Sequence, residues 1–398
     1  MKYIILVPDG VADEPVAELG GKTPLEAART PNMDRMAREG LSGLVKIIPD
    51  ALPPGSDIGN MSVLGYDPAK GFTGRSPLEA ANLGIVLSDD ELAFRCNLVT
   101  VKDGVMIDYS AGHITINDAA AIMKTIAAKL NNDLVHFHTG KSYRHITVLK
   151  TTDTAKFQAI KCTPPHDIMG QDITPYLPKG AGSEVLLEYV RRADPILTSH
   201  PVNLARVARG EAPGNMLWFW GQGGRPRLES YKDKFGLSGS IISAVDLVNG
   251  IGRIIGLKII DVPGATGYYD TDFKAKGEYA VRSLKDNDFV YVHVEATDEA
   301  GHNGDAREKV RAVENFDRDV VGTVLEAFRG RDDFRILVTP DHPTPVVKRT
   351  HTRAPVPFVM FGKGIESNGA NRYNETSAQQ VGFKFSSGEA MVRHFMGR

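Results

Sequence analysis

The sequence has little of several features that mark particular classes of protein. Cysteine occurs only twice in 398 residues, as Cys96 and Cys162, which argues against a disulfide framework and is typical of a reducing compartment. The first apolar run covers only residues 4–7, too short for a signal peptide, and no apolar run approaches the roughly 20 residues of a membrane span. We therefore expect a cytoplasmic protein without a membrane partner.

An excess of charge of one sign is also missing. The 47 basic and 49 acidic side chains give a formal net charge of −2, so no positive field favours binding to nucleic acid or to an anionic membrane. A GxxxxGK[ST] motif for nucleotide phosphates is absent as well. Hydrophobic residues make up 42% of the chain and charged residues 24%, as in ordinary soluble globular proteins, and the length allows two or three domains.

What is present is an alternation of strands and helices in the first and last parts of the chain. Residues 3–7 are predicted to form a strand, and Thr30 as N-cap with Pro31 favours a helix that begins there. The predicted strands are near-continuous runs of Val, Ile, Leu and Phe, which is typical of a mainly parallel sheet with helices on both faces. We therefore predict an α/β fold. Its later strands are expected at 239–245, 258–264, 288–297, 334–342 and 356–362, and its later helices at 247–256, 307–328 and 386–397.

The middle of the chain has a different pattern. Shorter alternating segments and a proline- and glycine-rich loop indicate a smaller α+β domain, residues 86–235, inserted into the α/β domain formed by residues 1–85 and 236–398. The predicted elements of the insert are a hairpin over 93–109 with a Lys-Asp-Gly turn, a helix over 118–130, an antiparallel strand pair over 134–150 and the loop 162–180.

Carboxylates follow three of the predicted strands of the α/β domain. Asp9 ends the segment "IILVPD", Asp298 follows "VYVHVEAT", and Asp341 ends "RILVTPD". A histidine, His342, comes directly after the last of these. Ligands of open parallel sheets bind at the carboxyl ends of the strands, so these side chains are candidates for one site.

Two further histidines belong to the same set. His302 lies four residues after Asp298, so one helical turn places both on one face, and His351 precedes a predicted strand. Taken singly, these residues are explained as a turn aspartate, a solvated ion pair and a structural histidine. Three carboxylates gathered at one sheet edge, however, would repel one another unless cations neutralised them.

The residue types of this set predict metal ions. Carboxylates and imidazoles without thiolates suit Mn²⁺, Zn²⁺, Co²⁺ or Fe²⁺. Six such groups are too many for one catalytic ion with an open position, and they suit two ions a few ångströms apart, as in phosphoryl-transfer sites. We expect two divalent metal ions, with Mn²⁺ as the first choice and Mg²⁺, Zn²⁺ or Co²⁺ as alternatives, and no organic cofactor.

Two serines lie in the segment "PPGSDIGNMSVLGYDP", residues 53–68. Ser56 is predicted at the start of a helix, where free backbone N–H groups and the helix dipole favour a phosphoryl group. Coordination to a divalent cation would activate its hydroxyl without a histidine base. Ser62 lies six residues further on, about 600° around a helix, and faces another way. We therefore expect Ser56 to be the nucleophile and Ser62 to be structural.

Seven segments of the sequence resemble the cofactor-independent phosphoglycerate mutases of the archaeal-type branch, which belongs to the alkaline phosphatase superfamily. The resemblance covers nearly the whole chain and is most specific in the α/β domain. It implies an alkaline-phosphatase-like domain interrupted by an inserted substrate-binding domain. The segments are "VPDGVAD", "KTPLEAARTPNMDRMAREG", "PPGSDIGNMSVLGYDP", "TGRSPLEAANLGI", "EATDEAGHNGD", "VTPDH" and "HTRAPVPF".

The resemblance also implies how the two metals are shared among the residues. Ser56 would be the residue that is phosphorylated. One metal would be held by Asp9, Ser56, Asp341 and His342, and the second by Asp298, His302 and His351.

The inserted domain carries polar clusters that are candidates for holding a substrate carboxylate or phosphate. The alternative interpretation, a surface or structural role, stays open for each of them. The candidates are His113 in "YSAGHI", Lys141 and Arg144 in "GKSYRH", His166 and Asp167 in "PPHD", and Arg225 in "WGQGGRPR".

The sequence thus predicts an enzyme that interconverts 3-phosphoglycerate and 2-phosphoglycerate through a metal-bound phosphoserine. Its partner would be a small phosphorylated carboxylic acid, and the oligomeric state is not predicted. A homoserine kinase-like phosphotransferase on the same metal site is the first alternative, because a subgroup of the family is proposed to have that activity. A metal-dependent phosphatase or phosphodiesterase is the second alternative. A non-catalytic binding protein is disfavoured, since all seven site positions are present.

Overall fold

The computed structural model describes residues 1–398, which divide into two compact units. The first unit contains Met1–Phe72 and Arg227–Arg398, and the second contains Thr73–Pro226. The chain therefore leaves the first unit earlier than the expected boundary at residue 85, and it returns at residue 227 rather than at 236.

Specific contacts explain the shifted boundaries. Helix α5 (Arg75–Asn82) belongs to the second unit, because the Ser76 hydroxyl donates to the Gly221 carbonyl (2.6 Å) and accepts from the Arg95 amide (2.7 Å). Helix α10 (Tyr231–Phe235) belongs to the first unit, because Tyr231 stacks on Phe289 with the ring centroids 4.4 Å apart. Neither contact follows from local sequence pattern, which is why the predicted limits were wrong.

The first unit is built on an eight-stranded sheet in the order β13-β2-β12-β11-β1-β10-β8-β9. All neighbouring strands are parallel except β12, which runs antiparallel to both β11 and β2. The expected α/β class with a mainly parallel sheet is confirmed. Its strands are β1 (Lys2–Pro8), β2 (Leu41–Val45), β8 (Gly239–Ile242), β9 (Lys258–Ile259), β10 (Phe289–Val294), β11 (Phe334–Val338), β12 (Val356–Gly362) and β13 (Lys384–Phe385).

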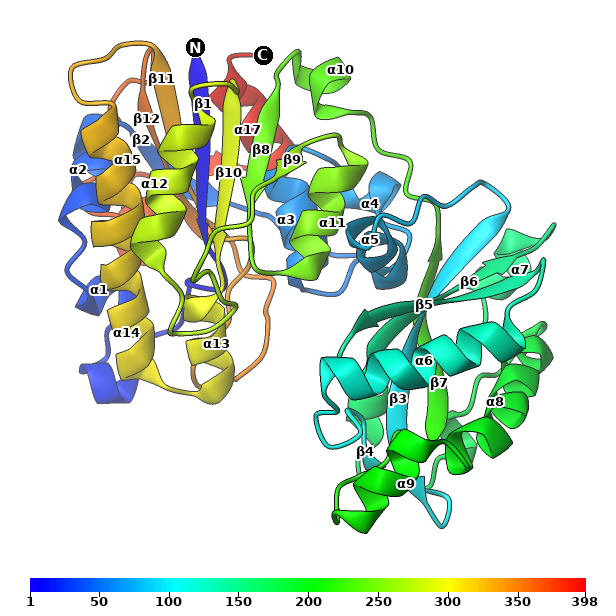
Figure 1. Ribbon diagram of the computed structural model, residues 1–398. Coiled ribbons are helices and arrows are strands. Elements are labelled where there is room, and N and C mark those ends of the chain that lie inside the picture. The colour runs from blue at the N-terminus through cyan, green and yellow to red at the C-terminus, as the bar shows by residue number, and fades with distance from the viewer. The chain divides into compact units, whose positions relative to one another are not determined.

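Helices cover both faces of this sheet (Figure 1). Alternate strand residues, such as Leu6 and Val292, pack with α2, α12, α14 and α15 in one apolar core. Helices α3, α11 and α17 lie on the opposite face. The helices are α1 (Pro24–Ala27), α2 (Pro31–Glu39), α3 (Ser56–Val63), α4 (Pro68–Gly71), α11 (Asp246–Ile254), α12 (Phe273–Ser283), α13 (Ala296–Asn303), α14 (Ala306–Asn315), α15 (Gly322–Ala327), α16 (Glu375–Gln380) and α17 (Gly388–Met396).

The long helix predicted over 307–328 is interrupted by a π-helical segment, Phe316–Val321, between α14 and α15. Within this segment, the Asp317 carboxylate accepts hydrogen bonds from the backbone amides of Asn32 (3.2 Å) and Met33 (2.7 Å) at the start of α2. Thr30 occupies the N-cap position of α2 as predicted, but its side chain makes no capping hydrogen bond. A carboxylate far away in the sequence satisfies these helix N–H groups instead.

The second unit contains an antiparallel sheet in which β3 pairs with β4, β6 and β7, and β6 pairs with β5. Helices α6 and α8 pack on it around a separate apolar core (Figure 1). The hairpin with the Lys-Asp-Gly turn and the second strand pair are confirmed, whereas β7, α8 and α9 were not predicted. The elements are β3 (Glu91–Lys102), β4 (Val105–Asp108), β5 (Val135–Lys141), β6 (Arg144–Lys150), β7 (Met216–Gly224), α6 (Ile116–Leu130), α7 (Thr154–Gln158), α8 (Ser183–Thr198) and α9 (Pro201–Ala208).

A fully buried lysine joins the loops that follow β1 and β11. The Lys309 ammonium donates to the carbonyls of Gly10 (2.9 Å) and Thr344 (2.8 Å) and to the Asp13 carboxylate (2.7 Å). Each of its three N–H groups thus has an acceptor, and both charged side chains are 0% exposed. Lys309 therefore fixes the two loops that carry the polar residues at the strand ends.

We predict that Lys309→Met lowers the free energy of unfolding by about 3–5 kcal/mol, because it leaves the Asp13 carboxylate buried without a cation. Urea unfolding of the metal-free protein measures this loss. The matched control is Lys348→Met, which removes the exposed ion pair with Glu14 in the same region and should cost less than about 1 kcal/mol. Equal losses in the two variants would contradict the structural role of Lys309.

Candidate active site and metal centre

The polar residues predicted at the strand ends lie together because their strands are neighbours. Strand β1 lies between β10 and β11, and all three are parallel, so their carboxyl ends meet at one edge. Asp9 follows β1, Asp298 lies at the start of α13 after β10, and Asp341 follows β11. All three side chains are buried.

Four of the predicted ligands form a first group, defined here as Asp9, Ser56, Asp341 and His342. The His342 Nε2 atom lies 3.2 Å from the Ser56 hydroxyl oxygen. The same atom lies 3.5 Å from Asp9 Oδ1 and 3.5 Å from Asp341 Oδ2. One imidazole nitrogen, one hydroxyl and two carboxylates therefore converge on a common point.

The other three predicted ligands form a second group, defined here as Asp298, His302 and His351. As expected, Asp298 and His302 lie on one turn of α13, with Oδ2 and Nε2 3.2 Å apart. The Nε2 atoms of His302 and His351 are 2.9 Å apart, and His351 Nε2 lies 3.6 Å from Asp298 Oδ1. The Nδ1 atom of His302 faces the Arg349 carbonyl at 3.1 Å, which leaves Nε2 free to act as a ligand.

The two groups are adjacent. The rings of His342 and His351 are 4.1 Å apart, and one ligand atom each of Asp298, His342 and His351 lies within 4.8 Å of the others. The structure therefore brings all seven predicted ligands into one paired arrangement. That they bind metal ions, and that Ser56 is the nucleophile, remain predictions.

Ser56 and Ser62 occupy different environments, as their helical phase predicts. Ser56 is the first residue of α3 and points to His342. The Ser62 hydroxyl is buried and donates to the Ile47 carbonyl at 2.9 Å. Ser62 is therefore placed to hold α3 against the preceding segment.

Three residues that sequence reasoning missed support the two groups. Asn60 donates to Asp341 Oδ2 (2.7 Å) and to the Ser56 carbonyl (2.8 Å), and Tyr291 donates to the Asn60 side-chain oxygen (2.5 Å). Thr344 donates to the Asp298 carboxylate. In the sequence, only the four-residue spacing from Ser56 indicated that Asn60 lies near the site. The roles of Tyr291 and Thr344 depend on contacts between distant segments.

Two glycines permit the close approach of these elements. Gly10 has φ +60°, and a Cβ there would lie 2.4 Å from Asp298 Oδ1 and 2.5 Å from Thr344 Oγ1. A Cβ at Gly59 of α3 would lie 2.5 Å from the Asp341 carbonyl oxygen. A larger residue at either position would therefore push apart the segments that carry the ligands.

The electrostatics of the first group favour cations. Burial, followed by the charges of Asp341 and Asp298, raises the pKa of Asp9 well above its ordinary value of 3.8. Both Asp9 carboxylate oxygens are buried without a hydrogen-bond partner. Such an orphaned carboxylate beside two others fits a site for divalent ions, and the donor set of oxygen and imidazole without thiolate fits the metals expected from the sequence.

The second group has a different balance. Burial raises the pKa of Asp298, but hydrogen bonds from His302 and His351 outweigh burial and hold that pKa well below its usual range. The same hydrogen bond to Asp298 is the main reason that the pKa of His302 rises to about 9. In the metal-free protein a proton on the His302 imidazole therefore takes the place that a cation would fill.

Two polar residues at strand β10 were also missed: His293, which is buried within it, and Glu295, which directly follows it and is partly exposed. His293 and Glu295 lie in the apolar run "FVYVHVEAT". Burial, followed by Asp298, raises the pKa of Glu295, and burial lowers that of the neighbouring Lys276 to about 8. A polar residue inside a fully buried strand was the signal available in the sequence.

In the second unit, two tyrosine rings link two of the predicted substrate-binding residues. Arg144 lies over Tyr143 (5.5 Å), Tyr143 contacts Tyr109 (5.6 Å), and Tyr109 contacts His166 (6.0 Å). His166 in turn contacts Trp220, with 5.5 Å between the ring centroids. This cluster, which combines the Arg144 cation with the aromatic rings and His166, lies on β6, β7 and the adjacent loops.

The remaining predicted substrate residues are arranged around this cluster or apart from it. Lys141 is exposed, and its backbone is the strand partner of Arg144 at the end of the β5–β6 hairpin. Asp167 Oδ1 lies 3.5 Å from His166 Nε2. His113 is exposed with φ 50° in a loop next to that hairpin, since Ser142 donates to the adjacent Ile114 carbonyl.

Arg225 lies apart from this cluster. It follows Gly224, which pairs with Leu92, whereas Arg144 pairs with Asn97. The five-residue difference along β3 corresponds to about 17 Å. Arg225 instead faces Asp89 at 3.7 Å.

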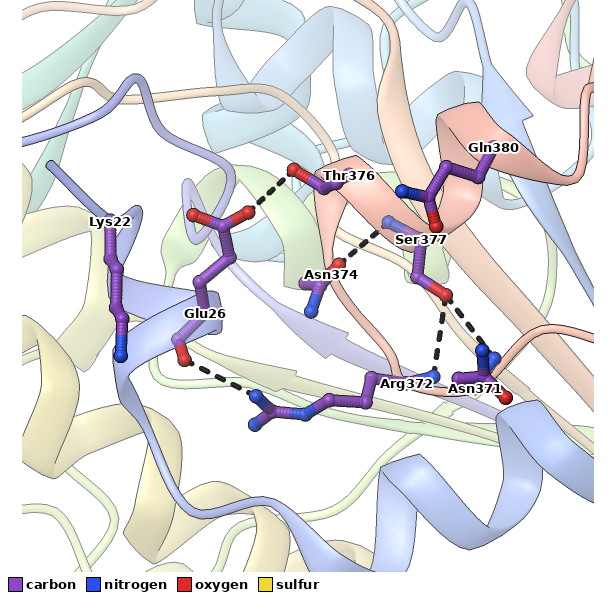
Figure 2. A pocket seen from close by; sticks show the side chains of 8 residues that line it. All are labelled: Lys22, Glu26, Asn371, Arg372, Asn374, Thr376, Ser377 and Gln380. Carbon is purple, nitrogen blue, oxygen red and sulfur yellow. Dashed lines mark hydrogen bonds between the residues drawn. The ribbon is translucent and has the colours of Figure 1, made fainter.

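A pocket of about 340 Å³ elsewhere on the first unit has none of this chemistry (Figure 2). Its side chains already serve the local structure: Arg372 pairs with Asp34 (3.1 Å), and the Glu26 carboxylate accepts from Thr376. No predicted site residue lines it. The full lining is Lys22, Glu26, Asn371, Arg372, Asn374, Thr376, Ser377 and Gln380.

Fold and site together define an α/β protein with a paired carboxylate–imidazole centre at the carboxyl ends of its central strands. No helix combines the length and the apolar character that a membrane span requires. The family model described as 2,3-bisphosphoglycerate-independent phosphoglycerate mutase matches residues 37–203. The chain is 46% identical over 394 residues to the enzyme of that name from Methanothrix thermoacetophila, with 99% of each chain covered.

Further relatives agree. A protein of Geobacter sulfurreducens named as a probable mutase of the same kind is 47% identical, with 100% of each chain covered. A solved structure from Pyrococcus horikoshii is 30% identical with a TM-score of 0.85, covering 100% of this chain and 96% of the other. The cofactor-independent phosphoglycerate mutase of Thermoplasma acidophilum is 28% identical with a TM-score of 0.71, covering 100% and 99%. This chain belongs to the 2,3-bisphosphoglycerate-independent phosphoglycerate mutase family.

The raised pKa of Asp9 predicts a pH dependence of the metal-free protein. Because the folded state holds the Asp9 proton more tightly than the unfolded state, this residue lowers stability increasingly as pH rises from about 4 towards its folded pKa. Metal-free Asp9→Asn should therefore be more stable than wild type near pH 7, and the difference should shrink towards about pH 4. Thermal unfolding in the presence of a chelator measures it.

Added Mn²⁺ should reverse the order, since wild type gains about 2.7 kcal/mol at 100 times its dissociation constant and Asp9→Asn gains less. Asp50→Asn, at an exposed carboxylate paired with Lys46, is the control that should change neither behaviour. A metal-free Asp9→Asn protein less stable than wild type would contradict the repulsion described above.

Proposed function

We propose that this chain interconverts 3-phosphoglycerate and 2-phosphoglycerate, with Ser56 as the residue that is phosphorylated. The observation that carries the proposal is the position of the Ser56 hydroxyl, at the first residue of α3 and 3.2 Å from His342 Nε2. Family membership supports the reaction, and the arrangement of the first group supports the nucleophile.

The residues of the site suit transfer of a phosphoryl group. The first group would hold one cation and the second group another, with Mn²⁺ as the expected metal. When bound, such ions lower the pKa of the serine hydroxyl and neutralise phosphoryl oxygens. The backbone N–H groups at the start of α3 face the oxygens of a phosphoryl group on Ser56. Asn60 holds both α3 and Asp341 in place.

Two bond exchanges make up the proposed reaction. The Ser56 oxygen forms a bond to phosphorus while the bond to the C3 oxygen of the substrate breaks, and that oxygen receives the serine proton. The C2 hydroxyl then takes the phosphoryl group back and returns its proton to Ser56. No nucleotide takes part, which agrees with the absence of a GxxxxGK[ST] motif.

The second unit offers the groups that would recognise the acid. Arg144 and His166 lie at the ends of the row formed by Tyr143 and Tyr109, and we propose that they bind the carboxylate of glycerate. Lys141 would add positive potential near the hairpin, and His113 would offer a further ring nitrogen there. A substrate with an ammonium group, such as homoserine, is less suited to this surface, and Asp167 is its nearest carboxylate.

We predict that the protein converts 3-phosphoglycerate to 2-phosphoglycerate with Mn²⁺ and without ATP, as measured in an enolase-coupled assay. Ser56→Ala should lower kcat by roughly 10⁴–10⁶-fold, because the nucleophile is lost. The matched control, Ser62→Ala, loses the hydrogen bond to Ile47 at a cost of about 1 kcal/mol of stability and should keep most of the activity.

The same assay separates the alternatives. Conversion that requires ATP, with phosphorylation of homoserine, would assign the chain to the kinase. Release of inorganic phosphate in place of 2-phosphoglycerate would assign it to a phosphatase. An active Ser56→Ala protein would leave the reaction in place but reject the nucleophile.

We predict that Arg144→Ala raises KM for 3-phosphoglycerate about 10–100-fold, since a charged hydrogen bond to a carboxylate is worth about 1.5–3 kcal/mol. The control is Arg192→Ala, because Arg192 also lies over a tyrosine ring, that of Tyr189 at 5.2 Å, but on α8. Steady-state kinetics should show no change for Arg192→Ala. Equal KM values for the Arg144 variant and wild type would remove Arg144 from the substrate site.

A further inference from the structure

His293 has a nitrogen that no protein group satisfies. Its side chain is 0% exposed, and its Nε2 atom lies 3.2 Å from Asp9 Oδ2. Despite this short distance, neither atom has a hydrogen-bond partner, because the ring N–H direction does not meet the carboxylate oxygen. The in-plane direction of Nε2 therefore leads to a point beside Asp9 rather than to Asp9 itself.

The other ring nitrogen of His293 is held from behind. Its Nδ1 atom lies 3.4 Å from the Ser243 hydroxyl and 3.7 Å from Glu295 Oε2. A carboxylate and a hydroxyl on this side favour a proton on Nδ1, which leaves a lone pair on Nε2. The Glu295 oxygen makes no hydrogen bond at 3.7 Å, but its negative charge behind Nδ1, with a lone pair on Nε2, resembles the arrangement found for metal-binding histidines in proteins.

The lone pair faces acceptors only. One ligand atom each of Asp9, His293 and Asp341 lies within 4.8 Å of the others, and the two carboxylates belong to the first group. Buried lone pairs that face one another without a donor are costly, so this cluster calls for a cation in its middle. Side chains alternate between the two faces along β10, so His293 lies on the same face of the sheet as Tyr291. That face is the one towards α3, because Tyr291 donates to Asn60 of α3.

We propose that His293 is a further ligand of the cation at the first group, and that Glu295 positions its imidazole. This inference rests on the metal centre of the proposed function but not on the mutase reaction. The first group would then offer two imidazoles, as the second group does, which favours Mn²⁺, Co²⁺ or Zn²⁺ over Mg²⁺. Lys276, which donates to the His293 carbonyl at 3.0 Å, holds the backbone at this position.

The test is the binding of Mn²⁺ to the full chain in the absence of substrate. Competition with a chelating dye gives the dissociation constants of both ions, and pulsed electron paramagnetic resonance counts the imidazole nitrogens at each ion. His293→Gln should weaken one of the two ions at least about 10–100-fold and remove one nitrogen coupling. Glu295→Gln should weaken the same ion less than Glu295→Leu, because a polar side-chain oxygen stays beside Nδ1.

The matched control is His145→Gln. His145 of the second unit is equally buried and also has an Nε2 atom without a partner, but it faces no carboxylate cluster. This variant should bind both ions as wild type does. Unchanged affinity and couplings in His293→Gln would overturn the proposal.

Two further outcomes decide the remaining possibilities. If wild type binds three ions and His293→Gln binds two, His293 serves a separate ion and the assignment to the first group is wrong. If His293→Gln does not fold, wild type itself provides the answer: two imidazole couplings at each ion support the proposal, and one coupling at either ion overturns it.

Discussion

The main constraint on the first unit is the repulsion between carboxylates, because its fold buries several of them at one edge of the sheet. Asp9, Asp298, Asp341 and Glu295 lie close together after neighbouring strands. Two such charges 4 Å apart repel by about 4 kcal/mol at an effective dielectric constant of 20. Cations that oppose this repulsion stabilise the edge. The buried ammonium groups of Lys309 and Lys276 supply part of that charge, and divalent ions at the two groups would supply the rest.

The surrounding structure brings these charges together and holds them. Parallel pairing of β10, β1 and β11 directs three loops to the same edge, and Lys309 ties two of these loops together through backbone carbonyls. Gly10 and Gly59 let the segments approach to distances that a Cβ would prevent. Asn60 and Tyr291 then link α3, and with it Ser56, to the central strands. The nucleophile proposed here is thus fixed by contacts that also hold the ligands.

The second unit has a different construction, without a cluster of buried carboxylates. Its antiparallel sheet carries a row of aromatic rings between Arg144 and His166, and the buried ion pair of Arg95 with Glu79 lies beneath Trp220 at one end of it. Aromatic faces keep a cation in place without neutralising it. The proposed binding of an anionic substrate would use the positive charge of Arg144 on this support.

The sequence by itself determined what depends on local pattern. Apolar runs that end in aspartate placed Asp9 and Asp341, the four-residue spacing placed His302 beside Asp298, and helical phase separated Ser56 from Ser62. Family resemblance predicted the pairing of the two ligand groups, and the membership is confirmed at 46% identity. The mainly parallel sheet and both hairpins of the second unit followed from residue periodicity.

Only the tertiary structure decided features that depend on contacts between distant segments. The unit boundaries follow from the packing of Ser76 and Tyr231, and the start of α2 is capped by Asp317, which is 284 residues away from Met33. His293 occupies an apolar strand, where its polar side chain was a signal but nothing in the sequence indicated which groups it would meet. Its chemistry comes from Asp9 and Glu295, and the distances that create it exist only once β1 and β10 are paired.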